Sequence, residues 1–317
     1  IDDSRSNGIT GPLTEDTTGT LFTAEDDYGT SLIFAGDIDN NWVSFAGYYW
    51  RIIRINGDGS VRMIYSGENT GSITDANRTG ETTQIGTSAF NEQTNDNAYV
   101  GYMYGTPGSD NYEETHANIN DSTIKTVLDN WYQINLSSYS SYISTEQGFC
   151  NDRRIATENE TWWNEDTKLG YGTNVTAYGP FSRFLTDDVN YNDIMQKPTL
   201  KCGQINDLYT MNISAKGNHA LQYPIGLITA DEVSYAGGFG GAVNIDYYLY
   251  TGEEYWTISP FDFGGYYAHQ FRISFDGWLG RMETNTIHGV RPVINLDASV
   301  TLSGSGTSID PYTVEGA

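Results

Sequence analysis

The sequence predicts an α+β domain built of short strands, one or two packed helices and long irregular loops. Short apolar runs are interrupted by many of the 35 glycines, and one segment shows clear helical spacing of its apolar residues. Long polar segments separate these elements. The hydrophobic share of 38%, which includes 24 Tyr, 12 Phe and 7 Trp, is enough for a substantial core.

The chain divides into a short polar start and one long domain. Residues 1–20 show no periodicity and contain Gly8, Gly11 and Pro12, so we expect a linker or N-terminal arm. Residues 21–317 are expected to form a single domain, because mixed folds of this length can be one unit. Polar segments at about 66–98 and 146–202 are expected to be insertions.

A β-hairpin is the first predicted element of the domain. Residues 32–35 form a short apolar strand and residues 43–55 a longer one. The turn formers Asn-Gly-Asp-Gly at 56–59 tolerate the positive φ of a tight turn, and residues 60–65 return as the partner strand. A further strand is expected at 99–105. His116 has no second histidine nearby, which predicts a solvated loop there rather than a metal site.

Two helices are predicted. In the first, Asp121 or Ser122 is the N-cap, and apolar residues follow at spacings of three and four. These residues are Ile124, Val127, Leu128, Trp131, Tyr132 and Leu136. The second helix is short and lies between Thr229 and Gly237. Asp231 and Glu232 occupy its first turn, where the helix dipole favours acids, so we interpret them as structural.

The two cysteines, Cys150 and Cys202, bear on the compartment of the protein. In an exported protein such a pair most simply forms a disulfide, while a catalytic thiol or two unpaired buried thiols are the alternatives. Few lysines and abundant Gly, Asn, Thr and Tyr favour a secreted or surface-displayed protein. Residues 299–314 are expected to form a last hairpin rich in Gly and Ser.

The charge of the chain excludes some partners. Forty-one acids against 16 bases give a formal charge of −25, and no segment concentrates Lys or Arg. We therefore expect no nucleic acid partner, since binding it requires clustered cations that neutralise phosphates. Direct membrane contact is not expected either, because no apolar run approaches the length of a membrane span.

No metal, cofactor or catalytic residue is assigned from the sequence. Residues 37–41 place oxygen-bearing side chains at alternate positions, as a calcium loop does at its start. The later positions of that loop are occupied by Trp42 instead of Gly and by Tyr48 instead of Glu. We therefore predict a polar turn at this place.

Four short motifs resemble those of one family of surface proteins. The motifs are VSFAG at 43–47 running into WRI at 50–52, IGLITADE at 225–232, YWTISP at 255–260 and GVRPVINL at 289–296. In this order they resemble surface proteins of gut Firmicutes with a C-type-lectin-like fold, akin to the formylglycine-generating-enzyme fold. Such chains include variable proteins of diversity-generating retroelements and modules behind type IV pilin-like N-termini.

The resemblance implies an extracellular ligand-binding protein or adhesin on a bacterial cell surface. In such variable proteins, residues between the two C-terminal motifs form a solvent-facing site on a rigid scaffold. Carried over to residues 264–288, the implied ligand-binding set is Tyr266, Tyr267, His269, Gln270, Arg272, Ser274, Trp278, Arg281, Glu283 and Asn285. The implied partner is a protein or glycan ligand on a host or neighbouring cell.

Strand periodicity sharpens this set. Along residues 268–275, Phe271, Ile273 and Phe275 share one face, which we expect to be buried. By the same parity His269 belongs with the buried face. Arg291 stands in an apolar run and is expected to be a buried, paired structural arginine.

Two other classes of function stay open at this point. One is a non-adhesive structural pilus or surface subunit. The other is an enzyme of the formylglycine-generating or glycan-cleaving kind, although the cysteines carry no motif of the former and no catalytic signature stands out. An exposed hairpin without binding function is also an alternative for residues 264–288.

Overall fold

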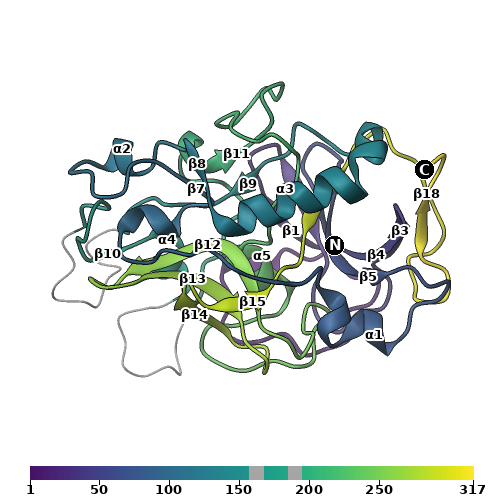
Figure 1. Cartoon of the computed structure of the whole chain (residues 1–317). Helices are drawn as coiled ribbons and strands as arrows, with labels where there is room; N and C mark the ends of the chain where they lie inside the picture. Colours follow the sequence, from purple (N-terminus) through teal and green to yellow (C-terminus); the bar gives the residue numbers. More distant parts are fainter. Residues whose placement is uncertain (157–167, 185–194) are drawn as a thin grey trace.

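A computed structural model describes residues 1–156, 168–184 and 195–317, and shows a mixed α+β protein with mostly short elements (Figure 1). The predicted fold class is therefore confirmed at the level of α+β, short strands and few helices. One sheet contains β1 (Phe22–Glu25), β2 (Thr30–Ile33), β3 (Trp42–Phe45), β4 (Tyr48–Ile55), β5 (Val61–Glu68), β16 (Val293–Leu296), β17 (Leu302–Ser303) and β18 (Tyr312–Val314).

A second sheet carries the C-terminal stretch that the sequence singled out. It contains β6 (Thr87–Ala89), β10 (Thr176–Ala177), β12 (Tyr255–Phe263), β13 (Ala268–Ile273), β14 (Leu279–Glu283) and β15 (Ile287–Gly289). In this sheet β13 lies between β12 and β14, and both pairings are antiparallel. Two small sheets pair β7 (Met103–Tyr104) with β8 (Asn120–Asp121), and β9 (Phe149–Cys150) with β11 (Leu208–Tyr209).

The helices are short except one. The α-helices are α1 (Asp75–Arg78), α2 (Tyr112–Thr115), α3 (Thr123–Asn135), α4 (Gly179–Phe184) and α5 (Ala230–Ala236). The 3-10 helices are η1 (Ser4–Asn7), η2 (Glu81–Thr83), η3 (Asn97–Val100), η4 (Ser137–Tyr142) and η7 (Ile205–Asp207). Figure 1 shows α3 running across the molecule, with β12 and β13 towards its left and β3, β4 and β5 towards its right.

Both predicted helices are confirmed. Ser122 caps α3 by accepting a hydrogen bond from the Lys125 amide, and its apolar face packs into the core. In α5, Thr229 and Glu232 form a capping box, and Gly237 with a positive φ ends the helix.

One hydrophobic core joins the two sheets and α3. Trp50 and Ile64 come from the first sheet, Trp256 and Phe271 from the second, and Leu128 from α3. Since both sheets and the helix contribute to one cluster, the C-terminal strands rest on the same packed scaffold as the N-terminal hairpin.

Several predicted elements differ from the structure. The hairpin turn at 56–59 is confirmed, but residues 43–55 are two antiparallel strands, β3 and β4. Ala46 and Gly47 both have positive φ and form the turn between them. The predicted strand at 99–105 is reduced to β7 and preceded by η3. The last hairpin is confirmed as β17 and β18.

The polar segments are more closely packed than their composition suggests. In the N-terminal arm, Ile9 is buried and Arg5 donates to the carbonyls of Ser234 and Tyr235 in α5. Segment 66–98 supplies β6 to the second sheet, and Phe90 is buried in the core. Part of segment 146–202, at 157–167 and 185–194, lies outside the described residues.

The prediction that His116 lies in a solvated loop is wrong. This histidine is buried rather than solvated, with Nε2 2.8 Å from the Gly170 carbonyl oxygen and its ring 4.4 Å from that of Tyr112. Burial, with the Arg153 guanidinium beside it, lowers the pKa of His116 well below its usual value. The polar sequence around it gave no sign of this, because its contacts come from distant segments.

Candidate functional site: a groove at one end of the C-terminal sheet

The two C-terminal motifs that frame the predicted site are buried scaffold. Every residue of β12 is buried, and the indole of Trp256 donates to the Ser88 carbonyl of β6. Arg291 is buried as predicted. Its partners are the carbonyls of Tyr65 and Leu249 rather than a carboxylate, and its guanidinium lies 4.8 Å from the centre of the Tyr255 ring.

Three residues of the predicted solvent-facing set are buried. Gln270 donates to the carbonyls of Val100 and Ile258, Arg272 pairs with Glu254, and the Ser274 hydroxyl accepts from the Trp278 amide. The alternation argument fails here because both faces of β13 are covered. In a sheet buried on both faces, strand parity no longer separates core from surface.

The prediction for Phe275 is wrong in the opposite direction. This residue was expected in the core, but its side chain is 65% exposed. β13 ends at Ile273, and residues 274–278 form a turn in which the Ser274 amide donates to the Trp278 carbonyl. Once the strand ends, its two-residue period no longer applies, and Phe275 projects from the turn into solvent.

The other predicted residues fall at two separate places. Tyr266 and Tyr267 are exposed in the turn between β12 and β13. Trp278 lies beyond the opposite end of β13, is 37% exposed, and donates its indole N–H to the Gly240 carbonyl. Glu283 is half-buried at the end of β14 and Asn285 is exposed in the following turn. The predicted set is therefore not one continuous surface.

At the Tyr266 end, a buried carboxylate ties two of the predicted residues together. His269 Nδ1 lies 2.5 Å from Asp262 Oδ1, and Arg281 Nη1 lies 2.7 Å from Asp262 Oδ2. The Asp262 side chain is fully buried, while His269 is nearly so. Since both oxygens of Asp262 are engaged, this cluster joins β12, β13 and β14 and serves as support.

At the opposite end, a similar cluster opens to a groove. Glu254 Oε1 lies 3.3 Å from Arg272 Nη2, and Glu254 Oε2 lies 3.0 Å from His288 Nδ1. The Glu254 side chain is 29% exposed. Burial lowers the pKa of His288 despite the nearby carboxylate, so the imidazole favours its neutral form. Burial likewise lowers the pKa of Arg272.

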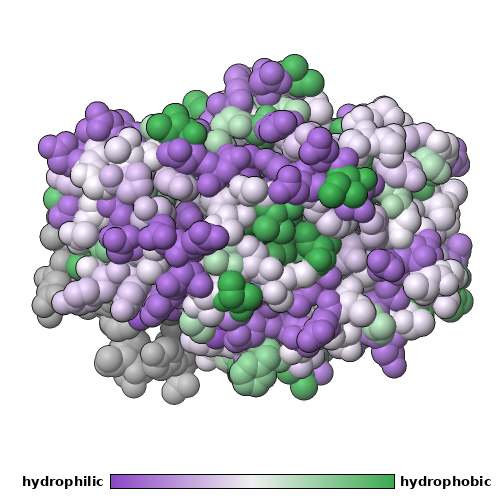
Figure 2. Space-filling view, viewed as in Figure 1, coloured by the Kyte–Doolittle hydropathy of each residue, from purple (hydrophilic) through white to green (hydrophobic). Residues whose placement is uncertain are grey.

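The groove beside Glu254 has a volume of about 570 Å³. Phe275 and Ile287, which is 60% exposed, supply its apolar contacts, and Glu81, Glu253 and Glu254 its negative charge. The face shown in Figure 2 is mostly hydrophilic, and one of its hydrophobic groups lies where β15 runs in Figure 1. An exposed aromatic and an exposed aliphatic residue at one acidic groove are features of a binding surface.

Sequence reasoning missed several residues of this groove, among them Glu253, Glu254, Ile287 and His288. Each of these four stands next to a motif that the sequence did identify, since the two glutamates directly precede Tyr255 and the other two directly precede Gly289. The parallel pairing of Tyr255 with Gly289 brings the two pairs together. That pairing is long-range, so only the fold reveals it.

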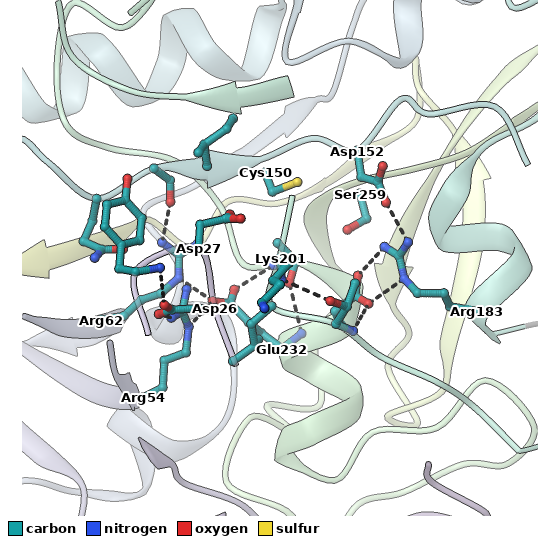
Figure 3. Close-up of a pocket in the computed structure, with 18 residues that line it drawn as sticks. Asp26, Asp27, Arg54, Arg62, Cys150, Asp152, Arg183, Lys201, Glu232 and Ser259 are labelled. Carbon is teal, nitrogen blue, oxygen red and sulfur yellow. Dashed lines mark hydrogen bonds and ion pairs between the residues drawn. The ribbon is translucent and has the colours of Figure 1, made fainter. Parts of the chain in front are cut away.

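A second candidate, a cavity in the interior, is lined by charged residues (Figure 3). Arg54 lies between Asp26 and Glu232 at 2.8 and 3.0 Å, and Arg62 contacts Glu232 at 2.5 Å. Burial opposes the charge of Glu232, but the two arginines outweigh it and lower its pKa. Its cavity of about 30 Å³ has room for water and not for an organic ligand.

The same cavity shows why the acids of α5 are structural. Arg183 pairs with Asp231 at 2.7 Å and with Asp152 at 2.6 Å, as Figure 3 shows. Asp231 and Glu232 thus each bind arginine in addition to favouring the start of the helix. The ion pairs therefore connect α5 to β4 and β5 of the first sheet and to α4.

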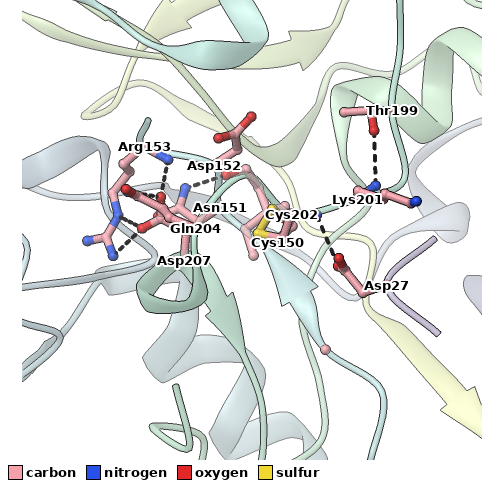
Figure 4. Close-up of a disulfide and its surroundings, with 12 residues drawn as sticks. Asp27, Cys150, Asn151, Asp152, Arg153, Thr199, Lys201, Cys202, Gln204 and Asp207 are labelled. Atoms are coloured by element: carbon pink, nitrogen blue, oxygen red, sulfur yellow. Dashed lines mark hydrogen bonds and ion pairs between the residues drawn. A yellow bond between two sulfur atoms is a disulfide. The ribbon is translucent and has the colours of Figure 1, made fainter. Parts of the chain in front are cut away.

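The predicted disulfide is present. Cys150 and Cys202 are joined across 52 residues, and neither provides a free thiol (Figure 4). Next to it the buried pair of Arg153 and Asp207 is 2.7 Å apart, and the Cys202 amide donates to Asp27. Disulfides are typical of extracellular and other oxidising compartments. In the described residues, no helix has the length and apolar character that a membrane crossing requires.

The described residues hold no group of three or more His, Cys, Asp or Glu side chains placed to bind a metal. In the polar turn at 37–41, Asp39 accepts from the Trp42 indole and pairs with Arg78 at 2.8 Å. That carboxylate is therefore engaged by protein donors.

Comparisons of the chain with models of protein families, with curated proteins and with solved structures give no match. The fold and site define a class, a disulfide-bonded α+β protein with an acidic, partly apolar groove on a buried sheet. Its function is therefore argued from the site itself.

Proposed function

We propose that this chain is a surface-displayed ligand-binding or adhesin module with a C-type-lectin-like fold. Within the C-terminal stretch 264–288, its binding site lies at the end that carries Phe275 and Ile287 and faces the groove. The motif resemblance supports the fold, and the mixed architecture with one disulfide agrees with it. The proposed partner is a protein or glycan on a host or neighbouring cell.

One observation carries the proposal. Phe275 and Ile287 are both strongly exposed at a groove that is lined in part by the paired strands β6 and β15. Exposed apolar side chains on a rigid base lose little conformational freedom on binding, so more of their burial appears as affinity. The groove therefore provides apolar anchors, while Glu81 and Glu253 provide an acidic rim.

The proposal also identifies the positions that can vary without harm to the fold. Tyr266, Tyr267, Phe275 and Asn285 are exposed, whereas Gln270 and its neighbours in β13 are part of the core. If retroelements diversify this chain, we expect variation in related copies at the exposed positions. Variation at Gln270 would contradict this.

A glycan and host-protein array tests the proposal. The wild type is compared with the double variant Phe275→Ser, Ile287→Ser and with a matched control, Tyr266→Ser, Tyr267→Ser. We expect the groove variant to lose the signal of any ligand that the wild type binds, and the control to retain it. Loss only in the control would move the site to the other end of β13. Retention in both variants would refute a site in this stretch.

A further inference from the structure

A second groove, remote in sequence from the C-terminal stretch, is lined by three aromatic residues. Tyr48 comes from β4, Tyr65 from β5 and Trp131 from the last turns of α3. Glu68 and Asn135 lie at the same groove, whose volume is about 490 Å³. Neither the motif resemblance nor the proposed function assigns a role to it.

The three rings form one continuous aromatic surface. Their centroids lie 5.3 Å apart for Tyr48 and Trp131, 5.5 Å for Tyr48 and Tyr65, and 5.8 Å for Tyr65 and Trp131. At these distances the rings contact each other. A quaternary ammonium ion thus has no space between them, which argues against a cation cage.

Two hydrogen-bond donors on these rings are unused. Among the described residues, neither the indole N–H of Trp131 nor the hydroxyl of Tyr65 has a hydrogen-bond partner. Burial, together with the nearby Glu68 carboxylate, raises the pKa of Tyr65, so its hydroxyl stays protonated. The aromatic surface thus offers donors to a ligand that supplies acceptors.

Two side-chain amides at the groove, those of Asn135 and Asn77, already make hydrogen bonds within the protein. The Asn135 Oδ1 accepts from the Tyr48 hydroxyl at 2.7 Å, and its Nδ2 donates to the Trp131 carbonyl at 2.9 Å. The Asn77 amide donates to the carbonyls of Ser66 and Glu68.

The charge of the groove is negative. Glu68 is exposed and has no ion pair in the described part of the chain, and no Lys or Arg lines the groove. The net charge of −25 extends this potential beyond the groove and would favour the approach of a cationic partner. A basic residue on the ligand would therefore be complementary to Glu68.

We propose that this groove binds a proline-rich peptide segment that carries an Arg or Lys. Proline rings pack on aromatic surfaces, and the polyproline II helix is already extended before binding, which lowers the entropy cost. Proline has no amide N–H, so its segment presents carbonyl acceptors to Trp131 and Tyr65. Its basic residue pairs with Glu68.

Peptide binding to the whole chain tests the proposal. A short synthetic proline-rich peptide with one arginine is titrated against the wild type, Trp131→Phe, Tyr65→Phe and Glu68→Gln. Tyr65→Phe deletes a hydroxyl that has no intramolecular partner, and Glu68→Gln removes only a charge. Trp131→Phe also shortens a ring that contacts Tyr48 and Trp50, so the melting temperature of every variant is measured to verify the fold. Glu92→Gln, an exposed glutamate that does not line the groove, is the matched control.

We expect Trp131→Phe and Tyr65→Phe each to weaken binding by about tenfold, the effect of one hydrogen bond. Glu68→Gln should remove the preference for the arginine peptide over the same peptide with alanine instead. No binding by the wild type, or equal binding by wild type and all three variants, would overturn the proposal. Binding of choline or an oligosaccharide at the groove, without binding of the peptide, would also overturn it.

Discussion

The two ends of β12 carry the same three kinds of side chain, but water reaches the carboxylate at only one of them. At each end a carboxylate contacts one histidine and one arginine. Asp262 is fully buried and its contacts with His269 and Arg281 are 2.5 and 2.7 Å. Glu254 is partly exposed and its contacts with His288 and Arg272 are longer, at 3.0 and 3.3 Å.

This difference in exposure distinguishes a carboxylate that only stabilises the fold from one that can also contact a ligand. A buried carboxylate must keep its partners, because a lone charge in the interior is costly. Water reaches the Glu254 carboxylate although its partners Arg272 and His288 are buried, so a ligand in the groove can contact it while those partners stay in place. The same residue types therefore hold strands together at the Asp262 end and face a groove at the Glu254 end.

The largest effect is expected from Cys150→Ser combined with Cys202→Ser, which tests whether either end depends on the disulfide. The bond closes a loop of 52 residues, so its loss should lower the free energy of unfolding by about 4 kcal/mol. Urea denaturation measures this. Glu254 and His288 have no strand pairing with the loop, whereas Ala177 in the loop pairs with Asp262. Without urea, the ring signal of His288 in NMR spectra should therefore stay unchanged, and any change is expected at His269. A change at either histidine would link that end of β12 to the disulfide.

Isosteric substitutions compare the two ends directly. We expect Asp262→Asn to lower the free energy of unfolding by about 3 kcal/mol, because it removes a fully buried charge that both His269 and Arg281 contact. The matched variant Glu254→Gln should cost less, about 1 to 2 kcal/mol, because water reaches the Glu254 side chain although Arg272 beside it is buried. Chemical denaturation of both variants gives the values. Equal losses would show that both ends are structural and would weaken the groove as a site.

His116, a third histidine, lies in the interior, and we expect it to give the steepest dependence of stability on pH. The pKa of His116 is lowered by burial and by Arg153, so the folded state resists a proton that the unfolded state binds below its ordinary pKa of about 6.5. Stability is therefore complete above that pH and falls as the pH decreases, by up to about 1.4 kcal/mol per pH unit. Denaturation at several pH values measures this slope.

His116→Gln is the control for that slope, because it removes the titrating group and keeps a polar side chain. The variant should be less stable at neutral pH but should lose less stability on acidification. A slope identical to that of the wild type would assign the acid sensitivity to other groups, for example His288, whose pKa is also lowered.

Local features of the fold were predictable from the sequence. Ser122 and Thr229 marked the starts of α3 and α5, and the Asn-Gly-Asp-Gly turn marked the hairpin, because capping and turn chemistry act over a few residues. The two cysteines predicted their disulfide for a similar reason. A pair leaves only one intramolecular connectivity.

Long-range contacts limited the prediction of the candidate site. Gln270 and Arg272 were expected at the surface because strand parity assumes one wet face, but both faces of β13 are covered. Glu254 and His288 lie 34 residues apart and meet only through the pairing of Tyr255 with Gly289. His116 and Trp131 face surroundings that distant segments create, so their neighbours in sequence say little about them.

The smallest effect is expected at Phe275, where sequence and structure disagree most. Phe275→Ser should change the free energy of unfolding by less than about 0.5 kcal/mol, because the side chain is exposed in a turn and packs little. Tyr266→Ser, at the other end of β13 and 79% exposed, is the matched control and should be equally mild. Thermal and urea denaturation measure both. A loss of several kcal/mol at Phe275 alone would place it in the core, as parity predicted. Phe275 would then not be available as an apolar contact in the groove, and exposure would no longer distinguish the two ends of β13.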